Sequence, residues 1–145
     1  MKLLATDTAL LALASTALAQ QELYVHGSNG VIYRIDSYAT QPTPVRVGTA
    51  APLNGDLPTD MAIDPISGDY FMTVYPGGNP SGSFTYRVDQ STFQATQVGG
   101  FNFFALNSLE FTPDGRLFGN GALAFGMVHI DLNTGGHTFI TNRFD

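Results

Sequence analysis

The sequence contains no cysteine and no tryptophan, and its one lysine is Lys2. Without cysteine the chain has neither disulfides nor thiolate metal ligands. Without tryptophan it lacks the large aromatic platform expected at many sugar-binding sites. The folded protein must therefore be held by its apolar core, by a bound ion or by association with other molecules.

Positive charge is also scarce: six basic residues stand against twelve acidic residues, and the formal net charge is −6. Binding to phosphate groups needs clustered positive charge, so this composition argues against nucleic acid and anionic membranes as partners. Proteins and glycans remain as the classes of partner to consider.

The first twenty residues, MKLLATDTALLALASTALAQ, have the pattern of a secretory signal peptide. Lys2 precedes an apolar run rich in Leu and Ala, and Ala17-Leu18-Ala19 fits the small-x-small cleavage pattern. The run from Thr8 to Leu18 is too short to span a bilayer, so a membrane anchor is the weaker alternative. We predict a signal peptide over residues 1–19, a secreted or periplasmic protein, and no membrane contact after cleavage.

Short motifs recur along the rest of the chain. Three segments alternate apolar and polar residues and end in Asp, as expected for half-buried strands that lead into turns: Tyr33-Arg34-Ile35-Asp36, Tyr86-Arg87-Val88-Asp89 and Val128-His129-Ile130-Asp131. A hairpin with a DPISG turn at Pro65 is repeated 48 residues later with a TPDG turn at Pro113. One structural unit is therefore predicted to occur more than once.

Each full unit is predicted to contain four strands. They cover residues 60–63, 69–74, 83–88 and 92–98 in one unit, and 108–111, 116–120, 126–130 and 137–141 in the next. An earlier unit lacks its first strand and has strands at 23–26, 31–36 and 44–47. Four antiparallel strands in about 40 to 50 residues is the period of a β-propeller blade. The alternative is an ordinary antiparallel sandwich with coincidental turns.

These motifs resemble those of secreted, bacterial-type β-propeller repeat proteins, in which LAFDPxxGxLY and LYRIDPxTGxxTxVG alternate. The resemblance covers nearly all of residues 20–145 and implies an all-β fold of antiparallel four-stranded blades, with a partial blade over 20–48 and blades over 60–99 and 108–142. One chain then holds about two and three quarter blades, whereas a closed propeller needs at least four. We expect an incomplete ring that copies of the chain close as a homo-oligomer, or else a fragment of a longer propeller.

The resemblance also implies a metal site. In six-bladed, sugar-lactonase-like propellers a Glu, with Asn and Asp residues on the innermost strands, holds a divalent cation. The matching residues here are Glu110, Asn107 and Asp60, whose oxygen atoms suit a hard ion such as calcium. The alternative is that Glu110, which alternates with Leu109 and Phe111, faces solvent. Calcium is the one cofactor that the sequence suggests.

Two further patterns have simpler explanations. DLNTGG, Asp131 to Gly136, resembles the start of an EF-hand loop, but Asn142 stands where the bidentate Glu belongs, and a turn between strands explains the same residues. His129 and His137 lie on adjacent predicted strands, where the hairpin could bring them together, yet two imidazoles make an incomplete zinc site.

The sequence contains no complete catalytic set. HGSNG places Ser28 near His26, but no strand-to-helix elbow follows. We therefore predict an exported, non-catalytic binding or structural module of the β-propeller type, which acts through loops and blade edges on a protein or glycan partner. The alternatives are a calcium-dependent, lactonase-like or hydrolase-like fragment of a six-bladed propeller, and a small oligomeric lectin.

Overall fold

The computed structural model describes residues 22–36, 40–79, 81–102, 105–121 and 126–140. The predicted signal peptide lies outside these ranges. The described residues form eleven strands and a short 3₁₀ helix, η1 (Pro76–Gly78), and contain no α-helix. No helix in this part of the chain is long and apolar enough to cross a membrane.

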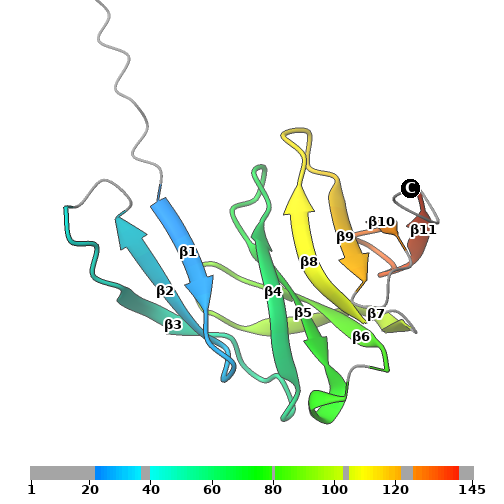
Figure 1. Cartoon of the computed structure of the whole chain (residues 1–145), viewed down its shortest axis with the longest axis horizontal. Helices are drawn as coiled ribbons and strands as arrows, with labels where there is room; N and C mark the ends of the chain where they lie inside the picture. Colours follow the sequence, from blue (N-terminus) through cyan, green and yellow to red (C-terminus); the bar gives the residue numbers. More distant parts are fainter. Residues whose placement is uncertain (1–21, 37–39, 80, 103–104, 122–125, 141–145) are drawn as a thin grey trace, which may run out of the picture.

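The strands form three antiparallel sheets, each made of consecutive strands (Figure 1). Sheet 1 consists of β1 (Glu22–His26), β2 (Val31–Asp36) and β3 (Val45–Thr49). Sheet 2 consists of β4 (Leu57–Ile63), β5 (Tyr70–Tyr75), β6 (Ser83–Val88) and β7 (Ala95–Asn102). Sheet 3 consists of β8 (Leu106–Phe111), β9 (Leu117–Gly121), β10 (Met127–Ile130) and β11 (His137–Phe139).

The predicted all-β class is confirmed, and each predicted strand is present. The three-stranded first sheet and the two four-stranded sheets that follow also agree with the repeat. The described residues form no closed ring, so their arrangement is compatible with part of a propeller and does not establish one.

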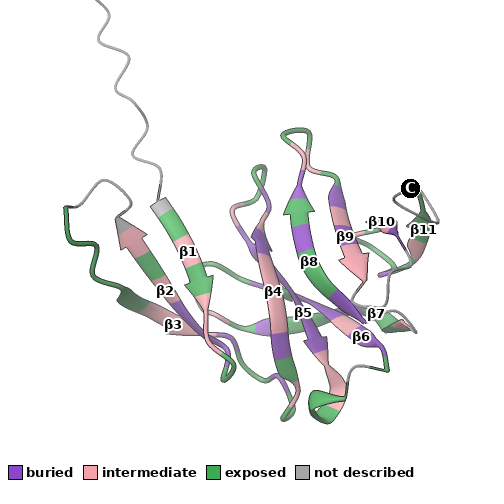
Figure 2. Cartoon of the chain, viewed as in Figure 1, coloured by how far each residue is buried: buried purple, intermediate pink, exposed green. Residues whose placement is uncertain are grey.

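Neighbouring sheets pack on each other through two apolar cores. The core between sheets 1 and 2 is centred on Ile32, Met72, Val74, Tyr86 and Val88. The core between sheets 2 and 3 is centred on Phe71, Leu106, Leu117, Val128 and Ile130. Sheet 2 is thus covered on both faces, and its strand β5 is buried along most of its length (Figure 2). A two-layer sandwich would have one such core, so the sandwich alternative is wrong.

Hydrogen bonds join sheets 2 and 3 at their first strands. Thr59 on β4 donates its hydroxyl to the carbonyl oxygen of Leu106 on β8, at 2.9 Å. The backbone amide of Leu109 donates to the carboxylate of Asp60. Because Leu109 is buried, the Asp60 carboxylate satisfies an amide that would otherwise lack an acceptor.

A backbone contact joins the same two sheets further out. The turn after β10 places Gly135 against Val98 and Gly99 in the middle of β7, so that a Cβ added to Gly99 would lie 1.9 Å from the carbonyl oxygen of Thr134. At the junction of sheets 1 and 2, the Phe93 ring covers Gly48 in the same way, and a Cβ on Gly48 would meet that ring at 2.3 Å. Gly48 and Gly99 thus both lie where the neighbouring sheet leaves no room for a side chain.

Candidate functional site

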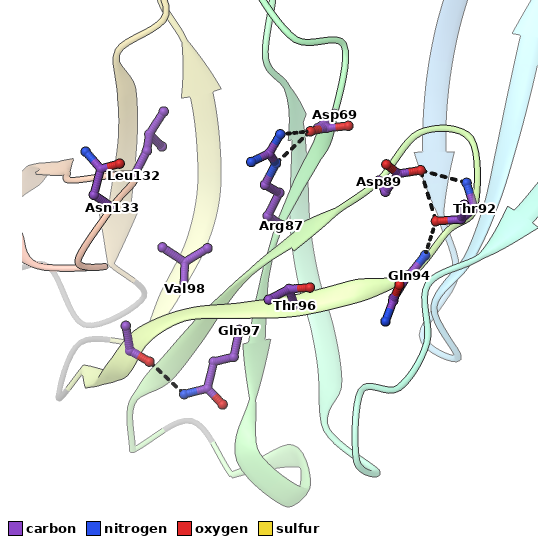
Figure 3. Close-up of a pocket in the computed structure, with 11 residues that line it drawn as sticks. Asp69, Arg87, Asp89, Thr92, Gln94, Thr96, Gln97, Val98, Leu132 and Asn133 are labelled. Carbon is purple, nitrogen blue, oxygen red and sulfur yellow. Dashed lines mark hydrogen bonds and ion pairs between the residues drawn. The ribbon is translucent and has the colours of Figure 1, made fainter.

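An open groove of about 580 Å³ lies between sheets 2 and 3. Figure 3 shows side chains from β6, β7 and the turns around them facing this groove, with the turn after β10 opposite. Its lining residues are Asp69, Arg87, Asp89, Thr92, Gln94, Thr96, Gln97, Val98, Gly99, Leu132 and Asn133. Eight of these eleven residues carry side chains that can form hydrogen bonds, so the groove is mainly polar.

An ion pair at one end of the groove fixes an arginine side chain. Nε of Arg87 donates to Oδ2 of Asp69 at 2.6 Å, and the Nη2 amine contacts the same oxygen. The other carboxylate oxygen of Asp69 accepts the backbone amide of Gln90 at 3.2 Å. The Asp69 side chain is 8% exposed, whereas that of Arg87 is 55% exposed. Asp69 thus positions a guanidinium group that still faces the solvent of the groove.

A carboxylate at the next turn is held by local hydrogen bonds. Oδ1 of Asp89 accepts the hydroxyl and backbone amide of Ser91, at 2.6 and 2.9 Å, and those of Thr92, at 2.9 and 2.7 Å. These hydrogen bonds keep the pKa of Asp89 well below its ordinary value. Asp89 is therefore charged at neutral pH and adds a second acceptor to the groove.

The two sheet junctions differ at one position. In the turn after β6, Phe93 takes a positive φ of 59° and packs its ring on Tyr70, with 6.2 Å between ring centroids. The corresponding position in the turn after β10 is Gly135, with a φ of 67°. Glycine adopts this conformation at little cost but has no ring to place between the sheets. The junction of sheets 2 and 3 therefore has close backbone packing of Gly135 on Val98 and Gly99 where the first junction has the ring of Phe93.

The groove offers both hydrogen-bond donors and hydrogen-bond acceptors. Arg87, Gln94 and Asn133 can donate, and the carboxylates of Asp69 and Asp89 can accept. The lining contains no histidine, cysteine or serine, so it offers no pair of nucleophile and imidazole base. This chemistry suits the binding of a polar ligand.

The predicted metal ligands lie along the first strands of sheets 2 and 3. Asp60 is half-buried on β4, while Asn107 and Glu110 are exposed on β8. The carboxylate of Asp60 accepts the backbone amide of Leu109. No group of three or more His, Cys, Asp or Glu residues in the described ranges could hold a metal ion. Asparagine lies outside that set, so calcium binding by Asp60, Asn107 and Glu110 stays a prediction.

The EF-hand-like segment forms a turn between strands. Oδ1 of Asp131 accepts the backbone amides of Asn133 and Thr134, at 2.8 and 3.1 Å, and these bonds lower the pKa of Asp131. The backbone also closes on itself, because the amide of Gly135 donates to the carbonyl of Asp131 at 2.8 Å. The hydrogen-bonded turn accounts for these residues, and Asn142 lies outside the described ranges.

The two histidines of sheet 3 do not share a face. In the antiparallel register His129 pairs with Thr138, and His137 pairs with Ile130. Residues that follow each other along a strand point to opposite faces, so His137 shares the buried face of Ile130 while His129 lies on the other face. The expectation that the hairpin brings the two imidazoles together is therefore wrong.

Burial of His137 makes stability depend on pH in a defined direction. Burial lowers its pKa from 6.5 to about 4. Between these values the unfolded chain binds a proton that the folded chain does not, so stability present above about pH 6.5 is lost as the pH falls toward 4. We expect the urea midpoint of the mature protein to fall over this range, and His137→Gln to flatten the dependence. His129→Gln, on the opposite face, is the control and should keep the pH dependence of the unaltered protein. An equally steep dependence in His137→Gln would show that His137 is not its cause.

Sequence reasoning missed the groove residues, because no motif of the sequence singles them out as a group. No protein-family model matches this chain, and no curated protein is similar to it at a significant level. The fold and groove define an all-β repeat protein with a polar groove between two of its sheets.

Proposed function

We propose that this chain is an exported, non-catalytic binding module of the β-propeller type, whose ligand occupies the groove between sheets 2 and 3. One observation carries the proposal: a hollow of about 580 Å³ surrounds an arginine that a buried carboxylate holds in place. Small-molecule sites commonly measure about 300 to 1,000 Å³ and contain a few fixed polar groups. Rigid strands on both sides support the same conclusion, because the groove is formed before the ligand arrives.

The chemistry of the lining favours a neutral, hydroxyl-rich ligand such as a glycan. Two carboxylates, Asp69 and Asp89, outweigh the single cation of Arg87, so an anionic ligand would meet net repulsion. Hydroxyl groups both donate and accept, which matches a lining of amide, guanidinium and carboxylate groups. Protein partners usually cover a larger surface with an apolar centre. The lining contains no aromatic ring, so a sugar would be held by hydrogen bonds and bind weakly.

The proposal is tested by titrating the mature protein with a panel of neutral mono- and disaccharides, followed by saturation-transfer NMR and calorimetry. We expect at least one sugar to bind, and Arg87→Ala to weaken its binding by about tenfold or more, because a charged hydrogen bond contributes about 1.5 to 3 kcal/mol. Arg46→Ala is the matched control, because Arg46 lies on β3, outside the groove, where Nη2 donates to Thr49 at 2.7 Å. Equal loss in both variants, or binding of peptides but not of sugars, would contradict the proposal.

A further inference from the structure

Because the three sheets are copies of one repeated unit, each face of one sheet corresponds to a face of the other two sheets. The leading face of a sheet is the one toward the preceding sheet, and the trailing face is the one toward the following sheet. In all three sheets an aromatic residue stands on the trailing face of the corresponding strand. These residues are Tyr24, Phe71 and Phe118, and each lies 47 positions after the one before it. The three residues therefore occupy equivalent positions in the repeat.

The first two aromatic residues pack against the next sheet. Tyr24 contacts Tyr70 of sheet 2, with 5.6 Å between ring centroids. Phe71 contacts Phe111 of sheet 3, with 5.3 Å between centroids. Phe118 has no following sheet within the described residues and is half-buried. Its ring contacts His129 on its own sheet, with centroids 5.4 Å apart.

The leading face at the other end of the molecule is apolar and uncovered. In sheet 2 this face carries Tyr70 and Met72, which are 6% and 0% exposed because sheet 1 covers them. The corresponding residues of sheet 1 are Leu23 and Val25, which are 52% and 36% exposed. Sheet 1 therefore presents the kind of surface that the fold buries at its other two leading faces.

Strand β2 continues this apolar surface. Its residues Tyr33 and Ile35 are half-buried, whereas their counterparts Tyr86 and Val88 in sheet 2 are 3% and 0% exposed. In the antiparallel register Tyr33 pairs with Val25, and Ile35 pairs with Leu23. These four residues thus form one contiguous strip on the leading face of sheet 1.

We propose that a second copy of this chain covers both surfaces: the leading face of sheet 1 in one copy packs on the trailing face of sheet 3 in the other, and the same contact forms twice. The argument is continuity with the two junctions inside the chain, each of which places an aromatic residue of a trailing face on the apolar strip of a leading face. Two copies supply six sheets, within the range of about four to eight blades found in propellers, whereas one copy supplies three and three copies supply nine.

The charged residue on the trailing face of sheet 3 fits this contact. Glu110 on β8 stands where β4 of sheet 2 carries the buried Ala62. Among the described residues sheet 1 contains three strands, and the first strand of the repeat is missing from this part of the chain. In the dimer Glu110 would face the place of this missing strand and stay in contact with solvent, so its charge costs little. Phe118, with His129 against its ring, then faces the apolar strip on β1 and β2.

The mass of the mature protein in solution tests the proposal. Light scattering and sedimentation velocity are expected to give twice the chain mass. Leu23→Lys, on the leading face, and Phe118→Asp, on the trailing face, are each expected to weaken the dimer by about tenfold or more, which corresponds to about 1.4 kcal/mol. Val45→Asp is the control, because Val45 is an equally exposed apolar residue of sheet 1, at 53%, outside the strip. Circular dichroism checks that each variant is folded.

Mixing the two variants tests the head-to-tail geometry. A mixture of Leu23→Lys and Phe118→Asp chains has one unaltered contact and one contact between Lys and Asp, so native mass spectrometry is expected to find the mixed dimer. A dimer through two leading faces would instead be insensitive to Phe118→Asp and would overturn the proposal. A monomer would also overturn the proposal, and the two faces would then be assigned to further sheets of a longer chain. Dissociation of the dimer by Val45→Asp would overturn it as well. The ligand groove lies within one copy, so sugar binding is expected to survive in the monomeric variants whether or not the dimer exists.

Discussion

Replacing Gly99 by alanine is expected to lower the free energy of unfolding by about 2 to 5 kcal/mol, because the new Cβ meets two separate obstacles. The backbone of Gly99 has a φ of 71°, a conformation in which an L side chain is strained. The added Cβ would also lie 1.9 Å from the carbonyl oxygen of Thr134, which belongs to the turn of the next sheet. Neither obstacle is the flexible end of a side chain, so sheets 2 and 3 must separate to relieve the contact.

The neighbouring glycine supplies the control. A Cβ on Gly100 would meet no atom within 4 Å. Gly100→Ala is therefore expected to change stability by less than about 0.5 kcal/mol, as surface substitutions usually do. Urea denaturation followed by circular dichroism, at one fixed protein concentration, measures both variants. Equal stabilities for the two would show that the contact of Gly99 with Thr134 does not hold the sheets together.

The same substitution links stability to the groove. Gly99 lines the groove, and the hydrogen bond of 3.3 Å from the Asn102 amide to the carbonyl of Gly135 spans the same junction. Separating the sheets moves Leu132 and Asn133 away from the opposite wall. At temperatures where Gly99→Ala remains folded, weaker sugar binding is therefore expected together with the loss of stability.

The strands could be predicted from the sequence because their signals are local. Alternating apolar residues specify the strands, and Asp, Pro and Gly specify the turns. The extensions of β4 and β7 were missed for equally local reasons. β4 begins at Leu57 and includes Pro58, a residue that argues against a strand and here sits beside a register shift. β7 continues through Gly99 and Gly100, which normally weaken a strand.

The groove could not be predicted in the same way, because it depends on contacts between sheets. Asp69, Arg87 and Asn133 are ordinary hairpin residues when each is considered in its own strand or turn. They come together only when the turn after β10 packs on β7, and the sequence does not give that distance. The Tyr-Arg-Val-Asp motif placed Arg87 on a strand correctly, but its carboxylate partner lies 18 residues earlier and was not part of the motif.

Removing the carboxylate of Asp60 is expected to cost about 1 to 3 kcal/mol of stability, because the buried amide of Leu109 then lacks an acceptor. Asp60→Ala removes this acceptor, whereas Asp60→Asn keeps an oxygen in place but loses the charge. If the residue acts as a hydrogen-bond acceptor between sheets 2 and 3, Asp60→Asn retains most of the stability that Asp60→Ala loses. Thermal unfolding of the mature protein with a chelator present measures the difference.

Repeating these measurements with calcium separates the two roles of Asp60. A ligand that binds only the folded chain raises its melting temperature, so a true calcium site gives a shift in the unaltered protein. That shift would disappear in Asp60→Asn and in Glu110→Gln, because each variant removes a charged ligand. Glu110 is exposed, so Glu110→Gln is also the control for stability and is expected to resemble the unaltered protein. A calcium shift lost in both variants would establish the predicted ion site, whereas destabilisation confined to Asp60→Ala and independent of calcium would make Asp60 a structural link between two sheets.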